Sequence, residues 1–303
     1  METIIIYSAN TEIARELVSA GRMLGSVTAL ALDEITANDL AATGTDVALY
    51  EGTEVIPADT AAVAQIIARA VAETRATVVL LGSDRRGKEL TGRVAAELGA
   101  GCLSDVKSIA VENGVIVCTR LSFGGATIAT ETITSPIKVI AVSPMAFEMA
   151  EAGASGVISS FGGEVAATIK VVGERAKVSE GVDLKAAEVI VAVGEGVEAE
   201  NVALADKLAQ ALGGVLACTK PTATDRKLLS EERVIGLSGA ITKPNLAIVI
   251  GISGQAQFSV GIRDAKTIIS INTDKNADMN RMSDYFMVKD SGEAIAELCE
   301  KLV

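Results

Sequence analysis

The segment GISGQAQFSVGIRDAK, residues 251–266, combines residue types and spacing that indicate a site for a negatively charged group. It follows the apolar run NLAIVI and turns at two glycines into a segment of helical period. Backbone N–H groups at such a turn can point at an anion, and the Ser253 hydroxyl and the amides of Gln255 and Gln257 add donors. Small residues let the backbone approach a diphosphate closely, so no P-loop lysine is needed. The alternative is a tight turn between strand and helix with Ser253 as the helix N-cap.

The sequence contains no histidine, and this excludes several catalytic mechanisms. Ser-His-Asp and Cys-His nucleophile systems, HExxH zinc sites and histidine general bases all need an imidazole. The four cysteines lie far apart without a CxxC pair, which favours small core residues over a metal site or a disulfide framework. We therefore expect a bound cofactor to supply any chemistry that the protein performs.

Charge and composition exclude two further classes of protein. Twenty-seven basic and thirty-nine acidic residues give a net charge of −12, which repels a phosphate backbone, so we expect no nucleic acid partner. No apolar run approaches the roughly 18 residues of a membrane span, so we expect no transmembrane segment. The first residues lack a basic region and a small-residue cleavage site, which predicts a cytoplasmic protein.

A second glycine turn, Gly194-Glu195-Gly196-Val197-Glu198-Ala199, matches the GxGxxA form of the dinucleotide fingerprint. Two features argue against NAD at this turn. The next predicted strand runs into Thr219 and Lys220 instead of the Asp or Glu that would bind ribose hydroxyls, and Glu195 and Glu198 would place carboxylates beside a pyrophosphate. A glycine turn between strand and helix also has a backbone explanation. Hydride transfer by an NAD-dependent dehydrogenase is kept as an alternative.

The elements that carry these turns are short Ile- and Val-rich runs that alternate with helical segments, as is typical of parallel sheets covered by helices. The predicted fold class is α/β with two domains. Residues 1–175 form an N-terminal parallel α/β domain with an antiparallel extension, and residues 176–303 form a C-terminal doubly wound domain. Alternation between Asp105 and Ser143 predicts the extension, with a hairpin turn at residues 112–114.

Local patterns predict several smaller elements. Asp59 precedes a helical segment in a capping position. Strands are predicted in ATIKVV at residues 167–172 and in RVIGLS at residues 233–238, and a helix in QAQFSVGIRDA at residues 255–265. A charged, glycine-punctuated segment follows ATIKVV, and this places the domain boundary near residue 175.

Taken in order, passages of the second half resemble the C-terminal FAD domain of the electron-transferring flavoprotein α-subunit family. That family has a VGxxG turn, a proline-containing lead-in, an AVGISGxxQH turn, a MKDSK-like helix end, an AIN strand end and a DYGIVxD strand. The corresponding passages here are IGLSG, KPNLAIVIGISGQAQF, IRDAK, SIN and DYFMVKD. In the first half, VVLLGSDRRGKELTGRVAAELGAGCLSDV is similar to the family's LGxxxxGxxLxxRVAAxL pattern followed by Ser-Asp.

The resemblance implies an electron carrier rather than an enzyme that converts a small substrate. Such an α subunit binds FAD in its C-terminal domain and pairs with a β subunit. It passes electrons between dehydrogenases, acyl-CoA dehydrogenases of fatty acid β-oxidation among them, and an electron acceptor. Ser238 would face the flavin N5, and Asn272 and Asp290 would serve the adenosine side. The implied cofactor-binding residues are Thr219, Lys220, Ser238, Ser253, Gly254, Gln255, Ala256, Gln257, Phe258, Asn272 and Asp290.

The sequence departs from the family pattern at three positions. Lys220 and Glu195 stand where the family has arginines, one against the flavin ring and one in the first glycine turn. Lysine keeps the charge but loses the planar set of donors. Phe258 replaces a histidine near the flavin, so it either faces the flavin without donating a hydrogen bond or packs as a core residue. The alternative function is that of a paralogue without tight FAD binding, which acts as an assembly or nucleotide-binding module.

Overall fold

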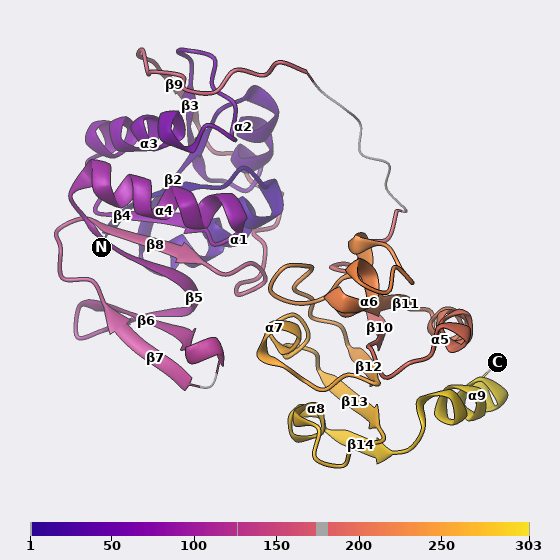
Figure 1. The fold of residues 1–303 in the computed structure, drawn as a ribbon. Coiled ribbons are helices and arrows are strands. Elements are labelled where there is room, and N and C mark those ends of the chain that lie inside the picture. Colours follow the sequence, from indigo (N-terminus) through magenta and orange to yellow (C-terminus); the bar gives the residue numbers. More distant parts are fainter. Residues whose placement is uncertain (1, 126, 174–180, 303) are drawn as a thin grey trace. The chain divides into compact units, whose positions relative to one another are not determined.

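The computed structural model describes residues 2–125, 127–173 and 181–302 (Figure 1). The chain divides into two compact units, residues 1–174 and 175–303. Both units are mixed α/β structures with parallel sheets, which confirms the predicted two-domain α/β class. The predicted boundary near residue 175 lies outside the described residues and stays a prediction.

The first unit alternates strands and helices from its first described residue. The sheet order β7-β6-β5-β8-β4-β1-β2-β3-β9 places β1 between β2 and β4, so the direction of chain progression reverses between β1 and β4. In open α/β sheets ligands bind at such a reversal, beyond the carboxyl ends of the strands. The elements are β1 (Glu2–Tyr7), α1 (Thr11–Arg22), β2 (Gly25–Ala31), α2 (Glu34–Ala41), β3 (Asp46–Tyr50), α3 (Thr60–Thr74), β4 (Val78–Gly82), α4 (Arg85–Leu98), β5 (Gly101–Glu112), β6 (Val115–Ser122), η1 (Phe123–Gly125), β7 (Thr127–Thr132), β8 (Lys138–Val142) and β9 (Ile158–Phe161).

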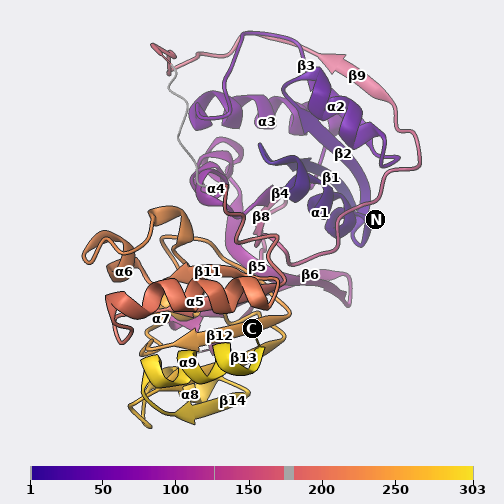
Figure 2. The ribbon, with the colours of Figure 1, turned by 90° about the vertical axis from the view of Figure 1, so that its right-hand side faces the viewer.

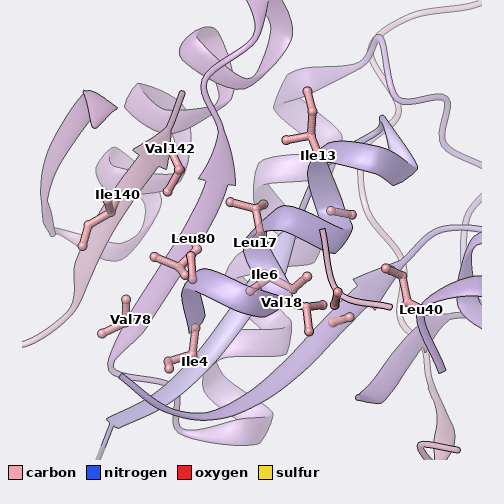
Figure 3. Close-up of a cluster of buried hydrophobic side chains, with 14 of the residues drawn as sticks. Ile4, Ile6, Ile13, Leu17, Val18, Leu40, Val78, Leu80, Ile140 and Val142 are labelled. Atoms are coloured by element: carbon pink, nitrogen blue, oxygen red, sulfur yellow. The ribbon is translucent and has the colours of Figure 1, made fainter. Parts of the chain in front are cut away.

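Side chains of the central strands alternate between two cores because successive residues of a strand face opposite sides. Ile4 and Ile6 of β1 pack with α1 and α2 on one face, where Leu17 and Leu40 are fully buried (Figure 3). Ile5, from the same strand, packs with α3 and α4 on the other face. Burial on both faces accounts for the continuous apolar runs that predicted a parallel sheet.

The antiparallel extension is formed by β5, β6 and β7, as the alternation between Asp105 and Ser143 predicts. The turn at Asn113 and Gly114 has positive φ at both residues, 50° and 79°, which matches the predicted hairpin. Beyond β7 the chain returns to the main sheet, where β8 pairs in parallel with both β4 and β5.

Residues 167–172 do not form the strand that the sequence predicts. The carboxylate of Asp59, which is 1% exposed, instead accepts the backbone N–H groups of Thr168 and Ile169 at 2.5 and 2.9 Å. The same carboxylate accepts the Thr168 hydroxyl at 2.8 Å and caps α3 through the N–H of Ala62 at 3.1 Å. Donors that a sheet ladder would use are therefore bound to one buried side chain. An unpredicted strand, β9, lies just upstream and pairs with β3.

The second unit contains a smaller parallel sheet in the order β11-β10-β12-β13-β14. This is the flavodoxin-like order, and its reversal lies between β10 and β12. Helices α5 and α9 lie side by side on one face of this sheet (Figure 2). The elements are β10 (Val189–Val193), α5 (Ala199–Ala211), β11 (Val215–Cys218), α6 (Lys220–Thr224), η2 (Glu231–Arg233), β12 (Leu246–Ile250), α7 (Ala256–Ser259), β13 (Thr267–Asn272), α8 (Asp278–Met282), β14 (Tyr285–Val288) and α9 (Ser291–Leu302).

Two predicted elements of the second unit differ in the structure. The strand expected at residues 233–238 is reduced to isolated bridges that pair Val234 with Cys218 and Ile235 with Ala240, because the chain turns back on itself at Gly236. The helix expected at residues 255–265 ends at Ser259 and continues as turns. The short helix α6 was not predicted. Among the described residues, none of the helices combines the length and apolar composition that crossing a bilayer requires.

Candidate functional site

The turn between β12 and α7 presents a row of unused backbone donors. Gly251 still donates its N–H to the sheet, at 2.9 Å from the oxygen of Ile271. Within the described part of the chain, the backbone N–H groups of residues 252–257 have no hydrogen-bond acceptor. A row of open N–H groups at the carboxyl edge of a parallel sheet, where a helix begins, is the arrangement that binds anions in α/β proteins.

Glycine is required at position 254 for two reasons. The backbone has φ +91°, and a Cβ on Gly254 would lie 2.2 Å from the amide nitrogen of Met279. The turn therefore rests directly on the start of α8, where the N–H of Met279 donates to the oxygen of Ser253 at 3.1 Å. Ser253 and Gln255 are exposed on either side of it.

Two other predicted residues support this turn. Asn272, at the end of β13, donates its side-chain amide to the oxygen of Ile252 at 3.0 Å. Ser238 is exposed on the turn that packs against α7, where the N–H of Leu237 donates to the oxygen of Gln257 at 2.7 Å. The two serine-glycine turns that the sequence singles out are therefore neighbours in space.

The remaining polar residues lie at the same edge of the sheet but on other strands. Lys220 is exposed at the start of α6, after β11, and the Thr219 hydroxyl lies 2.9 Å from that of Thr222. Asp290, after β14, accepts the N–H groups of Gly292 and Glu293 at 2.9 and 3.1 Å and so caps α9. The flavin roles of these residues remain predictions.

Phe258 is only 6% exposed and packs in the core beneath the turn. Its neighbours in that core include Ala192, Ile252 and Met279. This burial favours the second of the two interpretations that the sequence allows, a core residue, over a ring that faces the flavin.

Three backbone N–H groups of the glycine turn after β10 are already used within the unit. The N–H groups of Gly194 and Gly196 donate to the oxygens of Ile250 and Gly251, both at 3.0 Å, and that of Val197 donates within the turn. Its glycines are explained by packing, because a Cβ on Gly194 would lie 2.5 Å from the oxygen of Gly251. These contacts support the backbone explanation of the glycines at residues 194–199.

The helices of the two units differ in how they are capped. In the first unit the helices α1 to α4 each begin with a side-chain cap: Asn10, Asp33, Asp59 and Asp84. In the second unit the helices that begin at the carboxyl edge beside the reversal, α5, α6 and α7, have no side-chain cap, and neither does α8. Side-chain caps occupy the starts of helices α1 to α4 in the first unit, so the second unit is the one in which more backbone donors remain for an anion.

Sequence reasoning missed several residues that shape the site. Arg226 donates to the oxygens of Glu195 and Val197, and the Ser291 hydroxyl donates to that of Gly196 at 2.8 Å. These contacts join distant segments, and no local motif marks them. A local signal was available for the caps of the first unit, since an Asp or Asn precedes each helical segment.

The fold and the open N–H groups at the carboxyl edge of the second sheet define a two-domain α/β protein with a nucleotide-type site in its second domain. Comparison with known families agrees: the profile described as "Electron transfer flavoprotein domain" matches residues 8–161, and the profile described as "Electron transfer flavoprotein FAD-binding domain" matches residues 183–263. The chain belongs to the electron transfer flavoprotein α-subunit family, whose cofactor is FAD. Members of this family generally pair with a β subunit and with dehydrogenases.

Curated relatives include Protein FixB of Escherichia coli O127:H6, 35% identical over 229 residues that cover 74% of this chain and 73% of the relative. Protein FixB of Salmonella paratyphi A is 36% identical over 228 residues, with the same coverage. Among solved structures, MurG of Acinetobacter baumannii shares 11% identity with a TM-score of 0.33, over 99% of this chain and 83% of that protein.

Proposed function

We propose that the backbone row at residues 252–257 holds the diphosphate of FAD and that the chain works as the flavin-carrying half of a heterodimer. The observation that carries the proposal is that these six N–H groups lack acceptors within the described part of the chain. A diphosphate offers several charged acceptor oxygens, and hydrogen bonds to charged acceptors are the stronger ones. When bound, FAD supplies the electron-carrying chemistry that the side chains of this protein do not.

The side chains of the site then have binding and orienting roles. Gly254 permits the close approach of the backbone, Asn272 holds the turn through the oxygen of Ile252, and Ser253 adds a hydroxyl donor. Lys220, exposed at the start of α6, supplies positive charge in this proposal, as the family resemblance implies. The partner is a β subunit, and electrons pass from a dehydrogenase, of the acyl-CoA or another class, to an acceptor in the cytoplasm.

A matched pair of glycine variants tests the proposal. Gly254→Ala adds one methyl group to the turn, and Gly92→Ala adds the same group to α4, where nothing lies within 4 Å of the new Cβ. Each full-length protein is stripped of flavin and titrated with FAD while flavin fluorescence is followed. We expect wild type and Gly92→Ala to bind one FAD and Gly254→Ala to bind it far more weakly. Equal binding by all three would move the site elsewhere. A wild type that takes up no FAD would instead support the paralogue without tight FAD binding.

A further inference from the structure

Arg226 lies against the turn that opens α5. One nitrogen of its guanidinium, Nη1, donates to the oxygen of Glu195 at 3.0 Å and to that of Val197 at 2.8 Å. The other, Nη2, lies 3.8 Å from a carboxylate oxygen of Glu198. The Arg226 side chain is 27% exposed, whereas that of Glu198 is 77% exposed. The guanidinium thus binds two carbonyls and a carboxylate of a single turn.

This turn lies beside the proposed diphosphate site, because Gly196 donates to the oxygen of Gly251 at 3.0 Å. It carries two exposed carboxylates, Glu195 and Glu198, whose charge opposes a diphosphate. The N-terminus of α5, which follows this turn, nevertheless has unpaired donors. The Glu198 side chain does not cap α5, and the N–H groups of residues 198–200 have no acceptor in the described part of the chain.

We propose that Arg226 is a positioning residue of the flavin site. It fixes the turn at residues 195–198 and draws the Glu198 carboxylate away from the start of α5. It also supplies, from a position 31 residues further along the chain, the positive charge that the turn lacks at Glu195. The inference rests on the proposed function, since it concerns how the carboxyl edge of the second sheet can bind the FAD diphosphate despite two nearby carboxylates.

Arg226 balances negative charge at short range. Without Arg226 the edge would hold two carboxylates with no cation on the turn, and two carbonyl oxygens would lose their donor. Arginine suits this role because its planar fork can serve several acceptors at once. The resulting arrangement has a guanidinium beneath the turn and open N–H groups at the start of α5.

The test uses the full-length chain and a second-site variant. Arg226→Gln is compared with Arg22→Gln, a control in the first unit where the arginine also donates to a backbone oxygen, that of Thr43. We expect Arg226→Gln to weaken FAD binding roughly tenfold, the scale of one charge-assisted hydrogen bond, and Arg22→Gln to leave it unchanged. Added salt should weaken FAD binding to wild type more than binding to Arg226→Gln, because a screened charge is missing in the variant.

Restoring charge at position 195 separates an electrostatic role from a purely structural one. In the double variant Glu195→Arg with Arg226→Gln, we expect FAD affinity to return to within about threefold of wild type. If the double variant binds no better than Arg226→Gln, or if Arg226→Gln binds as wild type does, the inference is wrong. Wild type and Gly254→Ala are titrated alongside. If wild type binds no FAD, the proposed function is wrong as well. If wild type binds FAD and Gly254→Ala binds it weakly, as expected, a failed prediction for Arg226→Gln overturns only the inference about Arg226.

Glu198→Gln keeps the test decisive even if Arg226→Gln does not fold. Glu198 is well exposed, so its substitution leaves packing intact. Removing its carboxylate leaves the charge of Arg226 unbalanced beside the ligand, and we expect FAD to bind about threefold more tightly, with a steeper salt dependence. An affinity and salt dependence equal to those of wild type would overturn the inference.

Discussion

Gly196 and Gly251 lie in direct backbone contact across the two turns that flank the chain reversal of the second sheet. The N–H of Gly196 donates to the oxygen of Gly251 at 3.0 Å, and a Cβ on Gly251 would lie 2.7 Å from the carbonyl carbon of Gly196. Gly251 also has φ +63°, a conformation that costs other residues free energy. The glycine turn at residues 194–199 therefore packs against the turn that follows β12 and helps to hold it in place.

This contact makes Gly251 a test of the coupling between the turns. We expect Gly251→Ala to lower the free energy of unfolding of the second unit by about 1–3 kcal/mol and to weaken FAD binding, since both turns must separate. Thermal unfolding and FAD titration measure the two effects. Gly213→Ala is the matched control, because Gly213 also has positive φ, +68°, but nothing lies within 4 Å of its Cβ position. Equal losses in the two variants would show that backbone conformation alone is responsible.

Phe258 provides a second prediction. Because its ring is buried in the core, Phe258→His should lower the free energy of unfolding of the second unit by about 1–3 kcal/mol, the scale of a buried polar group without a partner. The reduction potential of bound flavin should not change. Chemical denaturation and a reductive titration of the FAD-loaded protein provide the two readouts. A stable variant with a raised potential would place the side chain against the flavin after all.

Asp59 holds the segment that leads out of the first unit. Burial raises the pKa of this carboxyl, but hydrogen bonds from Thr168, Ala62 and Ile169 outweigh that effect and lower the pKa to about 2. The folded pKa lies below the ordinary value of 3.8, so the stabilisation is complete above that value and is lost as the pH falls toward 2.

We expect Asp59→Ala to lower the free energy of unfolding of the first unit by about 2–4 kcal/mol at neutral pH and to speed tryptic cleavage at Lys170. Asp33→Ala is the control, since Asp33 caps α2 without binding a distant segment. Cleavage at Lys170 that is equally slow in both variants would show that other contacts hold residues 167–172.

The cysteines should differ sharply in reactivity. Burial raises the pKa of Cys218 to about 12 and that of Cys118 to about 11, so their thiolates are scarce at pH 8, while Cys102 is exposed. Iodoacetamide at pH 8 should label Cys102 first, and Cys118 and Cys218 only after denaturation. Mass spectrometry of tryptic peptides measures this order, and early labelling of Cys218 would show that β11 opens in the native state.

The sequence was sufficient where structure depends on local pattern. The apolar run before Gly251 and the small residues after it predicted both the strand and the turn, and alternation predicted the extension around Asn113. The structure differs where distant partners decide. Asp59 binds the N–H of Thr168 across 109 residues and so prevents a strand there. Whether the Phe258 side chain points into the core or toward a ligand depends on how α7 packs on the second sheet. The contacts of Arg226 join distant segments and follow from no local motif.

Amide hydrogen exchange of the full-length protein, with and without FAD, tests the central claim most directly. The unpaired N–H groups of residues 252–257 should exchange rapidly in the free protein and slow markedly when FAD binds, because each would gain an acceptor. The capped helix starts after Asn10 and Asp84 should exchange alike in both states. Protection that appears at those first-unit helix starts while residues 252–257 stay unchanged would contradict the account.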